Sequence, residues 1–380
     1  MNNQRHLFTL PDDFHYLNCS YMSPLLKSVE EAGINGIRLK REPWRVHPDD
    51  FFQQSDELRK LFARIINTSD PMNIAIIPSV SYGMAVVARN LPNSTGKNIV
   101  VAEEQFPSNY YPWLRYARSN NTEFRQISRH GSGAEWNKAI NEAIDENTLL
   151  VALGNVHWTD GTLFDLKTIG EKARSAGAYF VIDGTQSIGA LPFDIAEIQP
   201  DALICAGYKW LMGPYSIGLA YFSERFTNGI PIEENWLLRE ESSDFSQLVN
   251  YKNAYQPGAV RFDVGERSNF ILVPMMEAAL QQILDWGVSN IQDYCRALSD
   301  ELIDNLDALG YKIEDTAYRA DHIFGIRLPK HVKTEVAKQK FQDKNISVSF
   351  RGSAIRVAPN VYNTRGDIEI MRSALKELVE

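Results

Sequence analysis

Short apolar runs alternate with amphipathic segments over residues 73–222. The apolar runs predict strands at 73–77, 98–102, 148–153, 178–183, 201–207 and 217–222. The segments at 82–91, 134–144 and 165–176 carry apolar side chains at helical spacing and predict helices. Strands that are apolar throughout need cover on both faces, so the alternation predicts an α/β fold with a mostly parallel sheet between helices.

The pattern changes after residue 222. Residues 223–268 are rich in loop-forming residues and are expected to leave the sheet. A long helical pattern at 274–309 precedes strand-like runs at 322–328, 346–350 and 354–358, with helices near 333–343 and from 364 to the end. We therefore expect an N-terminal segment (1–30), a large domain (31–268) and a smaller α+β C-terminal domain (269–380).

Composition narrows the class of protein. The chain has 39 Lys and Arg against 48 Asp and Glu, a net charge of −9, which argues against binding of nucleic acid or anionic membrane. No run approaches the ~18 apolar residues of a membrane helix. The N-terminus has no signal-peptide apolar core, so we expect a cytoplasmic protein. Three widely spaced cysteines predict neither a disulfide framework nor a metal site.

Two charged side chains follow predicted strands. Asp183 ends the strand at 178–183, and Lys209 comes shortly after the strand at 201–207, between Tyr208 and Trp210. A buried carboxylate is costly unless it has a partner, and desolvation favours a neutral lysine. Asp183 and Lys209 could simply pair with each other, or Lys209 could point to solvent. The carboxyl ends of such strands are also where ligands bind in doubly wound sheets.

A third feature is the start of the helix near Tyr82, which Ser79 or Ser81 can cap. Plain capping is one interpretation, and a phosphate site at the helix N-terminus is the other. The chain has no GxGxxG or GxxxxGK[ST] motif, which disfavours a dinucleotide or Walker site. An anion cradle, a carboxylate and a desolvated lysine together suit pyridoxal 5′-phosphate, whose aldehyde needs an amine and whose pyridine nitrogen needs a carboxylate.

A family resemblance is carried by two stretches, FDLKTIGEKARSAGAYFVIDGTQSIGALPFDI and DALICAGYKWLMGPYSIGLAYF. They resemble the cofactor-binding core of the class V aminotransferases, a family of fold-type I pyridoxal-phosphate enzymes that includes cysteine desulfurases, kynureninases and isopenicillin-N-epimerase-like proteins. The resemblance runs from about Tyr16 to the C-terminus and implies the fold-type I architecture, with a homodimer as the usual assembly.

The resemblance implies roles for individual residues around the cofactor. Lys209 would form the Schiff base, and Asp183 would bind the protonated pyridine nitrogen. Gln186 would hydrogen-bond the ring hydroxyl or the Schiff-base region. Val80 and Ser81 would offer backbone N–H groups to the phosphate, with the Ser81 hydroxyl assisting.

Further residues are implied by the segments EQFPSNYYPW and GNVHWTDG. Phe106 would cover the cofactor ring, although ordinary core packing is an alternative, and Asn109 would lie near the phosphate. Tyr208 could touch the phosphate. His157 is a candidate general acid/base, and a packed structural histidine is an equally good interpretation. Trp158 stands where many relatives carry an asparagine, so that contact is not expected here.

Substrate contacts are implied at the two ends of the chain. Arg356, in RGSAIRVAPNVYN, resembles the arginine that binds the substrate carboxylate, and the alternative is a side chain pointing to water. Asn18 and Tyr21, in YLNCSYMSPL, are candidates in a segment over the active site.

The stretch GAVRFDVGERSNF resembles the region that, in dimeric members of the family, contacts the cofactor phosphate bound by the partner subunit. Relatives often have Gly-Thr there, whereas this chain has Gly265 and Glu266, and a carboxylate would repel a phosphate. Arg261 and Arg267 could supply positive charge instead.

The resemblance implies an enzyme acting on the amino group or α-carbon of a small amino acid. We expect an aminotransferase, with a 2-oxo acid as possible second substrate. A lyase or epimerase is the alternative, and a non-catalytic cofactor-binding relative is less favoured. Cysteine desulfuration is disfavoured because the stretch SFRGSAIRV lacks the nucleophilic cysteine of that activity.

Overall fold

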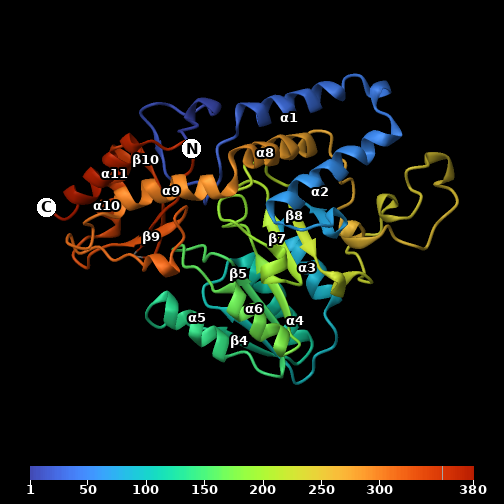
Figure 1. Ribbon diagram of the computed structural model, residues 1–380, viewed down its shortest axis with the longest axis horizontal. Helices are drawn as coiled ribbons and strands as arrows, with labels where there is room; N and C mark the ends of the chain where they lie inside the picture. Colours follow the sequence, from blue (N-terminus) through green and yellow to red (C-terminus); the bar gives the residue numbers. More distant parts are fainter. Residues whose placement is uncertain (353) are drawn as a thin grey trace.

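A seven-stranded sheet forms the centre of the molecule in a computed structural model that describes residues 1–352 and 354–380 (Figure 1). Its strands, in spatial order, are β2 (Ile74–Ile77), β8 (Gly218–Phe222), β7 (Ala202–Ala206), β6 (Tyr179–Asp183), β5 (Thr148–Gly154), β3 (Asn98–Ala102) and β4 (Glu123–Ile127). In this sheet β8 runs antiparallel to the other six strands, which are parallel to one another. The mostly parallel sheet is thus confirmed. β4 was not predicted because its residues lie at the sheet edge, partly exposed, and lack an apolar run.

Helices cover both faces of this sheet. α3 (Val80–Asn90) and α4 (Tyr111–Ser119) lie on one face, and α2 (Gln53–Ile65), α5 (Gly133–Glu142), α6 (Leu166–Ser175) and α8 (Leu272–Trp286) lie on the other. Alternate residues of each strand point into the two cores: in β6, Ile182 joins one cluster and Val181 the other. The strands are apolar throughout because both faces are buried.

The ends of the predicted helices follow local capping chemistry. Asp165 accepts a hydrogen bond from the backbone N–H of Thr168 at 3.1 Å and caps α6. Gly177, just beyond α6, has a φ of +73°, a conformation that glycine adopts most readily.

The long helical pattern at 274–309 is two helices rather than one. α8 ends at Gly287, whose φ is +79°, and α9 (Val288–Ile303) follows. α8 packs against α1 (Lys27–Leu39) and α2, whereas α9 packs against α11 (Arg365–Glu377). The glycine thus separates a helix in the core of the large sheet from one in the C-terminal layer.

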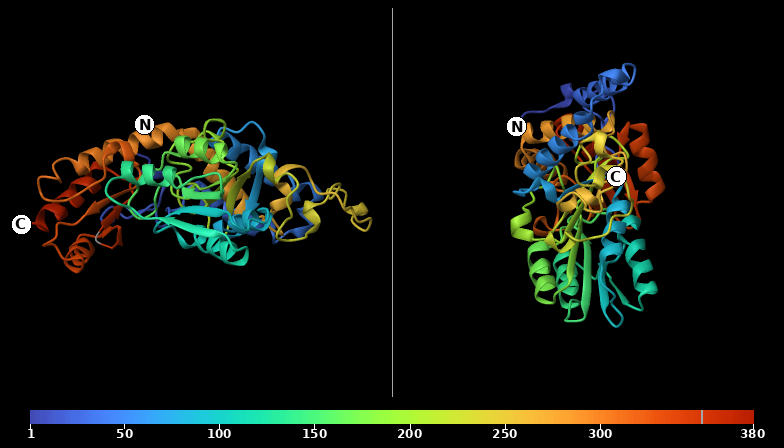
Figure 2. Two further views of the ribbon diagram at one scale, coloured as in Figure 1. Left: turned by 90° about the horizontal axis from the view of Figure 1, so that it is seen from below. Right: turned by 90° about the vertical axis from the view of Figure 1, so that its right-hand side faces the viewer.

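The C-terminal layer contains a three-stranded antiparallel sheet, with β11 (Ser349–Arg351), β12 (Ala354–Val357) and β9 (Phe324–Arg327) in spatial order, and the helix α10 (Thr334–Asp343). The N-terminal chain joins this layer, because β1 (His15–Tyr16) pairs in parallel with β10 (Ile346–Ser347). Leu17 is buried in the same apolar cluster. This layer forms one end of an elongated molecule (Figure 2).

Residues 223–268 leave the sheet, and part of them projects at the end opposite the C-terminal layer (Figure 2). The remaining elements of the chain are short: the helix α7 (Ile195–Ile198) and 3₁₀ turns at Arg5–Leu7, Pro43–Arg45, Pro48–Phe51, Pro71–Asn73, Pro107–Asn109, Glu224–Phe226, Trp236–Leu238, Phe245–Gln247, Gly258–Phe262 and Thr316–Tyr318. Within the described residues, the helices are too short or too polar to cross a bilayer.

Candidate active site

A cavity of about 330 Å³ opens where the carboxyl ends of β2, β3, β5, β6 and β7 meet at one edge of the sheet. The sequence-predicted residues that line it are Val80, Ser81, Phe106, Asp183, Gln186, Tyr208 and Lys209. Such an edge is the usual ligand site of open α/β sheets. The fold therefore brings together most of the residues proposed to hold the cofactor.

Lys209 is 6% exposed and does not point to bulk solvent. Burial, and after it the positive charge of Arg356, lowers the pKa of its amine to about 8. Its Nζ lies 5.4 Å from the ring centroid of Phe106 and 5.7 Å from that of Tyr208. Within the described part of the chain no carboxylate forms an ion pair with it. About a tenth of this amine is therefore neutral and nucleophilic at about pH 7, far more than for an exposed lysine.

Asp183 is buried at the end of β6 and faces the same cavity. Its carboxylate accepts a hydrogen bond from the backbone N–H of Thr185 at 3.0 Å. Burial raises its pKa, against the smaller lowering effects of Thr185 and of the Lys209 charge. No cation forms an ion pair with it among the residues described. A protonated ring nitrogen would supply the missing positive charge.

The N-terminus of α3 forms one wall of the cavity. Ser79 caps the helix by accepting a hydrogen bond from the N–H of Tyr82 at 3.2 Å, and its hydroxyl lies 2.9 Å from that of Ser81. Val80 and Ser81 occupy the first helical positions, where N–H groups have no acceptor within the helix. Capping and an anion site are therefore compatible here.

Gln186 lines the cavity with its amide already held by protein groups. Its Oε1 accepts a hydrogen bond from Trp210 Nε1 at 2.9 Å, and its Nε2 donates to the backbone carbonyl of Ser20 at 3.1 Å. The two bonds hold the side chain between Trp210 and the backbone at Ser20. Trp210 was not assigned a role from the sequence, although its place directly after Lys209 was the available signal.

Aromatic residues form the sides of the cavity. Phe106 packs edge-to-face on Trp158, with ring centroids 5.4 Å apart, and Tyr208 packs against Tyr215 at 4.6 Å. Asn109 does not line this cavity. It is fully buried behind the wall and accepts a hydrogen bond from Trp113 Nε1 at 2.9 Å.

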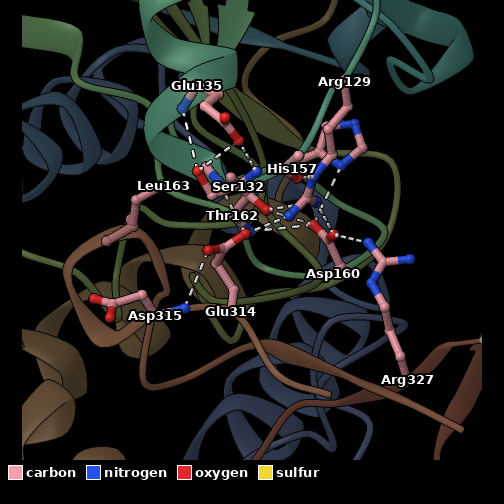
Figure 3. Close-up of polar contacts among 12 residues, drawn as sticks. Arg129, Ser132, Glu135, His157, Asp160, Thr162, Leu163, Glu314, Asp315 and Arg327 are labelled. Carbon is pink, nitrogen blue, oxygen red and sulfur yellow. Dashed lines mark hydrogen bonds and ion pairs between the residues drawn. The ribbon is translucent and has the colours of Figure 1, made fainter. Parts of the chain in front are cut away.

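The structure does not bring His157 to the Lys209 cavity. One ring nitrogen lies 3.2 Å from the carbonyl of Glu103 and the other 2.8 Å from the hydroxyl of Thr159. The ring also packs edge-on against Trp136. Figure 3 shows it beside Asp160, within a cluster of polar contacts. This environment suits the packed-histidine interpretation.

Arg356 is buried and does not point to water. Its Nη1 donates to the carbonyl of Trp158 at 2.8 Å, and its Nη2 donates to the Ser349 hydroxyl at 3.2 Å. Burial lowers the pKa of this guanidinium to about 9. Asn18 accepts a hydrogen bond from the same Ser349 hydroxyl and so supports Arg356 indirectly. Tyr21 is 59% exposed and does not line the cavity.

Arg261, Glu266 and Arg267, the residues predicted to lie near the partner subunit's cofactor phosphate, have other surroundings within this chain. Arg267 Nη1 lies 2.8 Å from the buried carboxylate of Asp263. Arg261 lies over the ring of Tyr255 at 5.2 Å. Glu266 borders a separate hollow beside α1. Arg267 is therefore already neutralised by its own chain.

Sequence reasoning also missed Thr185. Its N–H bonds the Asp183 carboxylate, and its hydroxyl accepts a hydrogen bond from the N–H of Ala206 at 3.1 Å, which ties β6 to β7 beside Lys209. The signal was its position within the GTQS sequence that follows Asp183.

The donor set of the cavity fits a specific kind of cofactor. A lowered-pKa lysine suits an aldehyde, a buried unpaired carboxylate suits a cationic ring nitrogen, free helix N–H groups suit a phosphate, and aromatic walls suit a flat ring. The fold and the site define a pyridoxal-phosphate-dependent enzyme.

Comparison with known proteins identifies the family to which the chain belongs. The model of the family described as aminotransferase class-V matches residues 46–375, so the chain belongs to that family and its cofactor is pyridoxal 5′-phosphate. It is 26% identical to the uncharacterized aminotransferase YcbU of Bacillus subtilis, over 98% of this chain and 96% of the relative. It is 25% identical to a probable cysteine desulfurase of Methanothermobacter thermautotrophicus, over 85% and 83% of the two chains.

Solved structures confirm the fold-type I architecture. An apo cysteine desulfurase from Thermococcus onnurineus superposes with a TM-score of 0.84 at 22% identity, covering 100% of this chain and 98% of the other. The cystine C-S lyase C-DES, in complex with cysteine persulfide, superposes with a TM-score of 0.85 at 19% identity, covering 97% and 98%. At these identities the likeness describes the fold alone.

Proposed function

We propose that the protein is an aminotransferase that moves the amino group of a small amino acid to a 2-oxo acid. The observation that carries the proposal is the buried amine of Lys209, whose lowered pKa and position beside Asp183 suit both cofactor attachment and proton transfer. When bound, pyridoxal 5′-phosphate supplies an electron sink that weakens bonds to the α-carbon of an attached amino acid.

The residues of this chain would divide the remaining work. Asp183 would hold the proton on the ring nitrogen, and the N–H groups of Val80 and Ser81 would bind the phosphate. Arg356 would orient the α-carboxylate through its guanidinium fork. Lys209, once released, would take a proton at the α-carbon and return one at a neighbouring atom.

The positions of the cysteines support the choice against desulfuration. Cys19, Cys205 and Cys295 are all buried, and burial raises the pKa of the Cys19 thiol to about 12. A protonated, inaccessible thiol is a poor nucleophile. In the stretch that would carry a catalytic loop, β11 ends at Arg351, β12 starts at Ala354, and the two strands pair antiparallel. Several relatives are nevertheless named cysteine desulfurases, so cysteine belongs in the test.

The test is an amino-acid panel added to the cofactor-loaded enzyme. Transamination predicts that the absorbance band of the lysine Schiff base is lost with one amino acid and regenerated by a 2-oxo acid. Elimination predicts release of ammonia and a 2-oxo acid without a second substrate, and epimerisation predicts loss of optical purity. Sulfide or persulfide release from cysteine would contradict the proposal.

A homodimer in the cytoplasm is part of the same proposal. Ile37 on α1 and Trp44 just after it are exposed. Beside them lies a hollow bordered by Leu39, Val46 and Phe51. Exposed apolar patches of this kind mark protein interfaces. Sedimentation of the loaded enzyme at twice the chain mass of 43.1 kDa is the expected result, and a monomer would contradict it.

A further inference from the structure

Two arginines lie on one face of the C-terminal sheet, beside the site. Ser349 on β11 pairs directly with Arg356 on β12, and Arg351 lies two residues further along β11. Because side chains alternate along a strand, Arg351 and Arg356 share a face and are diagonal neighbours, about 7–8 Å apart. Their guanidinium carbons lie 5.1 and 6.0 Å from the ring centroid of Trp158. The two cations therefore border the same indole.

Neither arginine has an acidic partner in the described part of the chain. The Nε atoms of Arg351 and Arg356 are buried without a hydrogen-bond partner. Arg351 donates one hydrogen bond, to the carbonyl of Phe350 at 2.9 Å. Two like charges left this way are costly, and the charge of Arg351 adds to burial in lowering the pKa of Arg356.

The neighbouring acids are already engaged. In Figure 3, Arg129 and Arg327 converge on Asp160, and Arg129 also contacts Glu314. Arg327 Nη2 lies 3.1 Å from the Asp160 carboxylate. The cluster pairs its own charges, so Arg351 differs from these two arginines in having no carboxylate partner among the residues that the structure describes.

A second cavity, of about 690 Å³, lies beside the active site. It shares Gln105, Phe106 and Trp158 with the Lys209 cavity, and Arg351 is on its wall. Glu103 and Glu104 also border it. The Glu103 carboxylate accepts a hydrogen bond from the backbone N–H of Arg129 at 3.2 Å. Glu104 is exposed to solvent. A substrate held near Lys209 would reach Arg351 by extending its side chain past Trp158, which borders both cavities.

We propose that Arg351 binds a second anionic group, so that the preferred substrate is an amino acid whose side chain ends in a carboxylate or a similar acid. Arg356 takes the α-carboxylate and Arg351 the side-chain anion, which gives the buried Arg356 and the half-buried Arg351 a charged partner each. The inference rests on the proposed function, because it assigns the substrate class of that same site.

The test compares acidic amino acids with their amides on the cofactor-loaded enzyme. We expect wild type to prefer L-aspartate or L-glutamate over L-asparagine or L-glutamine by about tenfold or more in kcat/KM. Arg351→Gln should lower kcat/KM for the acid by about 10- to 100-fold and change that for the amide by less than about threefold, because the amide has no charge to lose. Arg351→Lys should recover part of the preference, since it restores the charge without the fork.

Arg118→Gln, an exposed position on α4, is the matched control and should leave the preference unchanged. Equal wild-type activity on acids and amides, or an equal loss on both in Arg351→Gln, would overturn the assignment.

Binding gives a readout that does not depend on turnover. Calorimetric titration of the loaded enzyme should show succinate or glutarate binding about tenfold tighter than butyrate or pentanoate, and Arg351→Gln should abolish the difference. If the dicarboxylate preference is present but no amino group is transferred to a 2-oxo acid, the substrate class stands and the proposed reaction fails. If transfer occurs with no such preference, the reaction stands and the substrate class fails.

Discussion

Two buried aspartates show how differently this chain treats a carboxylate. Asp263 is fully buried between Arg59 and Arg267, with Arg59 Nη1 at 3.1 Å and Arg267 Nη1 at 2.8 Å, and it also accepts the N–H of Ile76 at 2.7 Å. Asp183 is nearly as buried but accepts only the N–H of Thr185 among the described backbone groups.

The two aspartates differ in whether a buried charge has an ion-pair partner within the protein. Asp263 is satisfied by its own chain and links α2, β2 and the loop that follows β8. Asp183, Lys209 and Arg356 are buried without an opposite charge in ion-pair contact, among the residues that the structure describes. Burying them costs stability. Asp183 and Lys209 line the cavity, where their charges can meet a ligand, whereas both Nη atoms of Arg356 donate hydrogen bonds to Trp158 and Ser349.

The largest effect is expected at the amine itself. Lys209→Ala should abolish the Schiff-base absorbance band and lower kcat by at least ~10⁴-fold, because the cofactor attachment and the proton shuttle are lost together. Lys172→Ala, an exposed position on α6, is the control. An intact band in Lys209→Ala would refute the assignment of the site.

Asp263→Asn should destabilise the fold, because it removes the carboxylate that pairs with Arg59 and Arg267. Removing the carboxylate leaves Arg59 and Arg267 buried without their partner, which should lower the free energy of unfolding by about 3–5 kcal/mol. Urea denaturation measures this, with the exposed Asp13→Asn as control, expected within about 0.5 kcal/mol of wild type. A cost as small as that of the control would show that the ion pairs do not stabilise the fold.

Asp183→Asn should lower activity with little effect on stability. We expect kcat to fall about 10²-fold, because an amide cannot stabilise a positive ring nitrogen. The cofactor-free protein should keep its unfolding free energy to within about 1 kcal/mol, because no ion pair is broken. Steady-state kinetics and urea denaturation together check it. A large loss of stability with little loss of activity would show that Asp183 is structural, as Asp263 is.

The smallest effect is a pH dependence of cofactor capture. Because only the neutral amine attacks an aldehyde, and the pKa of Lys209 is lowered to about 8, the initial rate at which the cofactor-free enzyme forms the band should rise about tenfold from about pH 6 to 7 and level off above about pH 8. Arg356→Gln removes a positive charge that lowers this pKa and should shift the plateau to higher pH. A rate still rising steeply at about pH 10 would indicate an ordinary exposed lysine.

The central sheet and its capped helices were accessible from the sequence because their signals are local. Continuous apolar strands such as β6, the Asp165 cap and the glycine after α6 are each visible within a few residues. The edge strand β4 was not, because a partly exposed strand needs no apolar run. The break of the 274–309 helix at Gly287 was also missed, since a single glycine is tolerated in many helices.

Within the site, strand-end positions and the family resemblance led to Asp183, Lys209 and the start of α3, which the structure gathers around one cavity. His157 and Asn109 fit the sequence pattern equally well, yet neither lines the Lys209 cavity, and both have hydrogen bonds of their own; His157 borders the second cavity instead. Position in the sequence shows which side chains are near a strand end, but not which way they turn.

The sequence by itself determined most of the central sheet, the family and the cofactor, because each depends on a short stretch of chain. Only the tertiary structure decided which buried charges have protein partners. Asp263 meets an arginine 204 positions away, whereas Arg351 and Arg356 meet no acid among the described residues. That distinction depends on the mutual approach of distant segments and on burial, which no local pattern contains.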